Sequence, residues 1–170
     1  MKARIQIAAS AGLILIALIY GAAIAGNVPN FSGVWVLDSS RSISAPAGLR
    51  QTMTVLHKGD QITVEHKLAN SQGERTFSET YTLDGKEAEF TPQGMTGPAP
   101  GKGKRKAYWL PDKRGVVVSD ETTTDGPKGP VVNQQMRKWI LSSDGRTLTI
   151  DYYFDGPRGS FEAKRVYDKQ

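Results

Sequence analysis

Short runs in which apolar and polar residues alternate recur from residue 31 to residue 167, and no stretch after residue 26 keeps helical spacing for three turns. Alternation with period two places successive side chains on opposite faces of an extended strand. The runs are also rich in Val, Ile, Thr, Tyr and Phe, which favour strands. The sequence therefore predicts an all-β domain.

Most of these runs are separated by short turn sequences that contain Gly or Asp, such as Asp84-Gly85 and Asp144-Gly145. Both residue types tolerate the positive φ that tight hairpin turns require. Hairpin following hairpin predicts an antiparallel up-and-down meander of about 8–10 strands, and closure into a barrel would remove its exposed edges, with a two-sheet sandwich as the alternative. The expected strands are Phe31–Leu37, Gln51–His57, Gln61–Leu68, Arg75–Leu83, Ala88–Thr91, Lys104–Leu110, Gly115–Thr122, Val132–Leu141, Thr147–Phe154 and Ser160–Tyr167.

Two longer loops are expected to interrupt the meander. Residues Pro92–Gly103 are dense in Gly and Pro, which disfavours both helix and strand and predicts a mobile flap. Residues Asp125–Pro130, with two Gly-Pro pairs, form the shorter loop.

The chain begins with a segment that has the layout of a secretory signal peptide. Lys2 and Arg4 precede an uncharged, mostly apolar stretch that closes with Ala23-Ile24-Ala25, a small-residue pattern typical of a signal-peptidase site. We therefore expect a signal helix over residues 1–25, cleavage before Gly26, and a mature protein in the periplasm or outside the cell.

An uncleaved membrane anchor is the alternative interpretation of the same segment. About 20 apolar residues can cross the hydrocarbon core of a membrane, and residues 5–25 would supply them. A membrane is an expected partner in that case alone. The 145 residues from 26 to 170 are enough for one domain with a sizeable core.

Composition excludes several classes of function. The chain has no Cys, so it forms no disulfide and offers no thiolate to a metal. Without Lys2 and Arg4, 20 basic residues face 17 acidic ones, a formal net charge of +3. This mild excess is far from the concentrated basic surface that nucleic-acid binding requires, and no nucleic-acid partner is expected.

Catalytic and metal-binding patterns are weak. His57 and His66 are expected on two arms of one hairpin, and isolated histidines explain them better than a metal site, so no metal and no cofactor is expected. Serine occurs without a Gly-x-Ser-x-Gly elbow. Carboxylate pairs such as Asp120 with Glu121 are interpreted as solvated strand faces. The sequence therefore favours a protein that is not an enzyme.

The densest basic run consists of Lys102, Lys104, Arg105 and Lys106, next to an aromatic pair. An electropositive rim that draws in an anionic ligand is one interpretation. The other, which we favour, is a charged strand that is protected from pairing with a second molecule, a known use of Lys.

The first expected strand contains Gly33-x-Trp35, which resembles the Gly-x-Trp signature of the calycin superfamily of lipocalins, fatty-acid-binding proteins and avidins. The resemblance to exported lipocalin-like proteins covers nearly all of residues 26–170 and implies a lipocalin-like barrel whose Trp35 plugs the closed end. It further implies that Arg165, near the end of the chain, lies over the Trp35 indole. True lipocalins place a helix before their last strand, and a turn stands there in this chain, so helix-free members are nearer in architecture.

In a closed barrel, alternate residues line the interior. The period-two count places aromatic side chains inside, which suits a small hydrophobic ligand. The alternatives are a structural or protein-interaction domain of the cell envelope with a solid-packed barrel, and a small barrel enzyme. The candidate ligand-binding residues are Phe77, Tyr81, Trp109, Tyr152 and Phe161.

Overall fold

The structure of the protein is a computed structural model, which describes residues 28–94, 97–99 and 101–170. The expected signal helix over residues 1–25 lies outside the described residues. All regular structure within them is β-strand, and they contain no helix that is long and apolar enough to cross a membrane.

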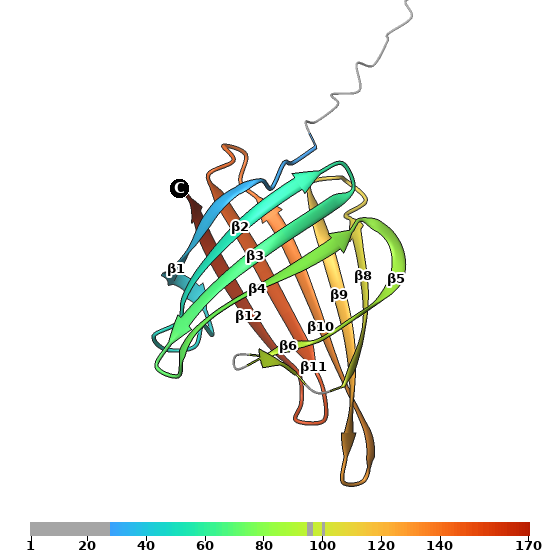
Figure 1. The fold of residues 1–170 in the computed structure, drawn as a ribbon. Coiled ribbons are helices and arrows are strands. Elements are labelled where there is room, and N and C mark those ends of the chain that lie inside the picture. The colour runs from blue at the N-terminus through green and yellow to red at the C-terminus, as the bar shows by residue number, and fades with distance from the viewer. Residues whose placement is uncertain (1–27, 95–96, 100) are drawn as a thin grey trace, which may run out of the picture.

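Ten strands form one antiparallel sheet, and two short strands form a separate one. Figure 1 shows the large sheet curving around the interior. The strands are β1 (Gly33–Ile43), β2 (Arg50–Lys58), β3 (Gln61–Asn70), β4 (Gly73–Thr82), β5 (Asp84–Phe90), β6 (Gln93–Gly94), β7 (Gly97–Pro98), β8 (Lys102–Trp109), β9 (Gly115–Gly126), β10 (Gly129–Leu141), β11 (Thr147–Asp155) and β12 (Phe161–Lys169). The predicted all-β antiparallel meander is confirmed.

The sheet curls into a barrel that is nearly closed. Its order is β4-β3-β2-β1-β12-β11-β10-β9-β8-β5. The first strand of the chain, β1, therefore pairs with the last, β12. The two edges of the sheet are β4 and β5, which follow one another in the chain through Leu83 but share no ladder. We call the unpaired boundary between β4 and the β5-β8 pair the seam.

Both predicted loops differ from expectation. Residues Asp125–Pro130 are the tip of a long hairpin, because β9 and β10 stay paired up to Gly126 and Gly129. Gly129 has a φ of 115°, which Gly adopts without strain, so a tight turn replaces the longer loop that we expected. The sequence predicts no strand in the segment Pro92–Gly103, but its described residues include the short β6-β7 pair, and β8 already begins at Lys102.

The closed end of the barrel is a packed apolar core centred on Trp35, which is fully buried. Its indole Nε1 donates a hydrogen bond to the Phe31 carbonyl oxygen at 2.9 Å. The Phe31 ring in turn lies edge-on to Trp139, with ring centroids 6.0 Å apart. Alternation on β10 thus turns Trp139 inward, while its neighbour Ile140 is only partly buried.

The cation over the Trp35 indole is Lys169, and our expectation for Arg165 is wrong. Lys169 Nζ lies 5.3 Å from the ring centroid, because β1 and β12 place Trp35 and Lys169 directly opposite each other. A Cβ on Gly33 would come within 2.6 Å of Lys169 Cε, so Gly33 leaves the space that the lysine stem occupies. Arg165 instead lies over Tyr152, 5.6 Å from its centroid, and donates to the Ile43 carbonyl.

We expect Trp35→Ala to lower the free energy of unfolding by about 3–5 kcal/mol, since it removes a large side chain from a fully buried site. Chemical denaturation monitored by far-UV circular dichroism measures this change. Phe161→Ala is the control, because Phe161 is 58% exposed and loses at most stacking of about 1 kcal/mol. Equal, small losses in both variants would show that Trp35 does not anchor the closed end.

Candidate functional site

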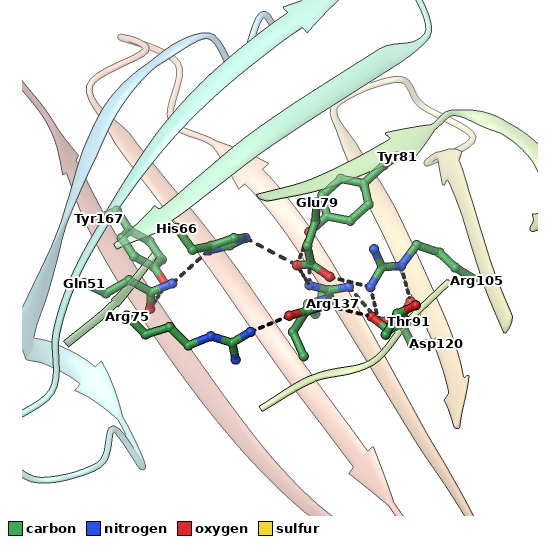
Figure 2. A network of polar contacts seen from close by, with 11 residues as sticks. Gln51, His66, Arg75, Glu79, Tyr81, Thr91, Arg105, Asp120, Arg137 and Tyr167 are labelled. Carbon is green, nitrogen blue, oxygen red and sulfur yellow. Dashed lines mark hydrogen bonds and ion pairs between the residues drawn. The ribbon is translucent and has the colours of Figure 1, made fainter. Parts of the chain in front are cut away.

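Four charged side chains meet inside the middle of the barrel. They are Glu79 on β4, Arg105 on β8, Asp120 on β9 and Arg137 on β10, and each is only 6% to 9% exposed (Figure 2). Each occupies an inward position of its strand. On β9, for example, Asp120 lies two positions after the buried Val118 and therefore on the same face of the strand. We call these four residues the ion cluster.

Every member of the ion cluster contacts partners of opposite charge. Arg105 donates from Nε to Asp120 Oδ1 at 2.6 Å and from Nη2 to Asp120 Oδ2 at 2.8 Å, a bidentate pair. Its Nη2 also reaches Glu79 Oε1 at 2.6 Å. Arg137 binds Asp120 Oδ2 at 2.6 Å and Glu79 Oε2 at 3.1 Å. Charge-assisted bonds of this kind are the strongest hydrogen bonds in proteins.

The ion cluster spans the seam, where backbone pairing is absent. Glu79 belongs to β4 on one side, and Arg105 belongs to β8 on the other. Tyr81, also on β4, donates its hydroxyl to Glu79 Oε2 at 2.8 Å and accepts from Arg137 Nη1 at 3.1 Å. Side-chain contacts therefore join β4 to strands on the other side of the seam, where no ladder joins them.

A chain of polar contacts continues from the ion cluster to the opposite wall. His66 on β3 places Nε2 3.3 Å from Glu79 Oε2, an ion-pair distance without hydrogen-bond geometry. Its Nδ1 lies 3.3 Å from Gln51 Nε2, and Gln51 Oε1 accepts a hydrogen bond from the Tyr167 hydroxyl at 3.0 Å. Figure 2 shows this line of contacts crossing the barrel from β12 to β8.

Opposite charges within the ion cluster offset the cost of burial. Burial alone would raise the pKa of Glu79, but Arg137, His66 and Arg105 outweigh it and hold that pKa well below its ordinary value. Burial also opposes the charge on Arg137, yet Tyr81, Glu79 and Asp120 keep its pKa above the usual value. Burial raises the pKa of the Tyr81 hydroxyl, so that group stays protonated.

A cavity of about 350 Å3 lies directly against the ion cluster. Aromatic residues form part of its wall, and the Tyr152 and Phe154 rings stack nearly parallel with centroids 5.9 Å apart. Typical small-molecule pockets measure about 300 Å3 or more. The full lining is Gln51, His66, Phe77, Glu79, Phe90, Pro92, Gln93, Ala99, Arg105, Asp120, Thr122, Asn133, Gln134, Gln135, Arg137, Tyr152 and Phe154.

The expected flap contributes to the cavity wall. Pro92, Gln93 and Ala99 all line the cavity, and Gln93 Oε1 accepts a hydrogen bond from Arg75 Nη2 at 2.5 Å. A Cβ on Gly101 would collide with the backbone carbonyl of Thr123, so this segment lies close against β9. The described residues Pro92, Gln93 and Ala99 thus form part of the cavity wall.

The structure separates the five candidate ligand-binding residues. Phe77 and Tyr152 line the cavity. Tyr81 is buried in the core and bonded to the ion cluster, and Trp109 packs against Phe31 at the closed end, with centroids 6.2 Å apart. Phe161 lies at the rim, stacked on Phe154 and bordering a hollow on the outer surface. A binding role for each of the five stays a prediction.

The two histidines lie at different levels of the barrel. His57 stands at the closed end, where its Nδ1 accepts from the Phe31 N–H at 3.3 Å, and His66 lies at the cavity. His57 is opposite Ile62 in the β2-β3 ladder, so His66 is four residues further along β3, roughly 13 Å away. No group of three or more His, Asp or Glu within the described residues is arranged to hold a metal ion.

The ion cluster was not expected from the sequence. Arg105 was assigned to a charged strand and Asp120 to a solvated face; the structure buries both, while Lys104 and Lys106 are exposed. The signal that could have identified them is their position in the alternation of inward and outward residues along each strand. Arg105 shares the period-two face of Ala107, and Arg137 shares that of Trp139.

The chain matches no protein-family model and no curated protein. Among solved structures, it is similar to zebrafish ileal bile acid-binding protein complexed with cholic acid, at 15% sequence identity and a TM-score of 0.50, over 82% of this chain and 98% of that one. It is also similar to secretory abundant heat soluble protein 4 from Ramazzottius varieornatus, at 12% identity and a TM-score of 0.43, over 82% and 94%. The strand order and the first likeness show a lipocalin-like barrel of the calycin type. At this identity, the likeness concerns the fold alone.

We expect Glu79→Gln to lower the free energy of unfolding at pH 7 by about 3–5 kcal/mol, because it leaves two buried guanidinium groups with a single carboxylate. The pKa of Glu79 is depressed in the folded state, so its stabilisation is full above the ordinary Glu pKa and is lost as the pH falls. Below about pH 4.5, the wild type should lose about 1.4 kcal/mol per pH unit from this group alone.

Urea denaturation between pH 7 and pH 3 measures both effects. Glu79→Gln should show a shallower acid slope than the wild type, and Glu74→Gln, whose side chain is 82% exposed, should match the wild type at every pH. An unchanged acid slope in Glu79→Gln would contradict the ionised state of the cluster.

Proposed function

We propose that this protein is a binding protein that holds a small, largely hydrophobic molecule in the cavity of its barrel. The observation that carries the proposal is the cavity of about 350 Å3, which lies within the size range of small-molecule pockets. A solid-packed structural barrel, the alternative from the sequence, would have no such space above its core.

The shape of the interior supports this proposal. Apolar residues fill the closed end around Trp35 and Trp139, and the ion cluster forms a floor above them. Phe77, Tyr152 and Phe154 then provide flat apolar surfaces beside the remaining space. The similar barrel of the zebrafish protein, which is complexed with cholic acid, agrees with an interior site on this architecture.

Binding fits the chemistry of the cavity better than catalysis does. A catalytic acid or base works best when its pKa lies near the working pH. Here the pKa of Glu79 lies well below that range and the pKa of Tyr81 well above it. Both arginines are engaged by carboxylates. We therefore propose a carrier that acts in the periplasm or outside the cell, where the signal-like start of the chain would direct it.

We expect the wild type to bind prodan, an uncharged naphthalene ketone whose emission shifts to the blue in apolar surroundings, with micromolar affinity or better, about −8 kcal/mol. Gln135→Trp should abolish the shift, because Gln135 lines the cavity and the indole would fill it. Met136→Trp is the matched control: it places the same side chain on the adjacent, outward-facing position of β10 and should leave binding unchanged. Equal binding by both variants would place the dye outside the cavity and contradict the proposal.

A further inference from the structure

The charges that face the cavity sum to zero. Arg105 and Arg137 contribute two positive charges, and Glu79 and Asp120 contribute two negative ones. The pKa of Glu79 is held low and the pKa values of both arginines are held high, so these three groups keep their charges across the neutral range. In the part of the chain that the structure describes, each guanidinium of the lining has two carboxylate partners.

The remaining polar lining offers hydrogen bonds without net charge. It consists mainly of amide and hydroxyl side chains, which donate and accept equally well. These residues are Gln51, Gln93, Thr122, Asn133, Gln134 and Gln135. Outside the lining, the nearby cation Arg75 donates to Gln93 Oε1 and lies over the Phe77 ring, 4.8 Å from its centroid.

From this balance, and resting on the proposed function, we propose that the cavity selects an uncharged amphiphile, a ring or short chain that carries hydroxyl or amide groups, and excludes carboxylates. An anionic ligand would bring an uncompensated charge next to Glu79 and Asp120. To reach a guanidinium, it would have to displace a carboxylate that is held at 2.6 Å. An uncharged hydroxyl faces no such competition and gains hydrogen bonds from the amides.

The size of the cavity limits the ligand further. About 350 Å3 corresponds to roughly a dozen water molecules at about 30 Å3 each. A naphthalene ring with one polar substituent has about that many non-hydrogen atoms. The parallel rings of Tyr152 and Phe154 suit such a flat body, since offset-stacked aromatic contacts are favourable.

The test compares two naphthalene ligands of similar size, one uncharged and one anionic. Naphthalenemethanol and the matched naphthoate are titrated into the wild type by isothermal calorimetry at pH 7.5, in parallel with prodan. We expect the alcohol to bind at least tenfold more tightly than the acid. Asp120→Asn removes one negative charge with little change of shape, and it should raise the ratio of naphthoate affinity to alcohol affinity at least tenfold.

A second variant covers the case in which Asp120→Asn does not fold. Thr122→Lys adds an unpaired cation at a partly buried lining position of β9 and should also raise naphthoate affinity at least tenfold. Thr123→Lys, on the adjacent outward position of the same strand, is its control and should behave as the wild type does.

The outcomes separate this inference from the proposed function. If naphthoate binds the wild type as tightly as the alcohol, or if added positive charge leaves its affinity unchanged, charge exclusion is wrong and the binding function stands. Binding of prodan without binding of the alcohol also overturns the inference. If prodan and both naphthalenes fail to bind, the proposed function itself is wrong.

Discussion

Glu79 stands where the barrel would otherwise be open. Its strand, β4, is one edge of the sheet, and the contacts of Glu79 with Arg105 and Arg137 reach the far side of the seam. A backbone edge without partners exposes donors and acceptors that invite pairing with another molecule. In this chain, buried ion pairs take the place of the missing ladder and tie β4 to β8 and β10 across the seam.

The same contacts divide the interior into two layers. Below the ion cluster, Trp35, Trp139 and Tyr81 pack as an apolar core. Above it, the side chains no longer fill the space, and the cavity begins. A buried ion pair is costly to desolvate and often adds little to stability compared with apolar packing. Here the ion pairs hold β4 in position across the seam and give the cavity a polar floor without net charge.

Much of the fold could be predicted because its signals are local. Turn sequences such as Asp144-Gly145 and the alternation in β11 depend on neighbouring residues alone. The role of Arg165 could not be predicted, since Arg165 and Lys169 share the inward phase of β12, and only the register opposite Trp35 decides between them. The ion cluster depends likewise on pairings between residues up to 58 positions apart.

The short loop at Asp125–Pro130 illustrates a further limit. Gly and Pro mark an interruption of a strand, but the same residues also form the tightest hairpin tips. Which of the two occurs is decided by whether the flanking residues find partners, and here Thr124 and Val131 pair across the hairpin. Sequence alone predicts that a turn is present, and the ladder determines how many residues it contains.

Spin labelling measures whether the ion cluster closes the seam. The chain has no native Cys, so cysteines can be introduced in pairs: Thr80→Cys with Lys106→Cys across the seam, and Thr54→Cys with Glu65→Cys across the β2-β3 ladder. All four positions are exposed. Dipolar broadening in the electron paramagnetic resonance spectrum should decrease for the seam pair when Glu79→Gln is added, while the ladder pair is unchanged. Equal broadening of the seam pair with and without Glu79→Gln would show that the ion cluster does not hold the seam closed.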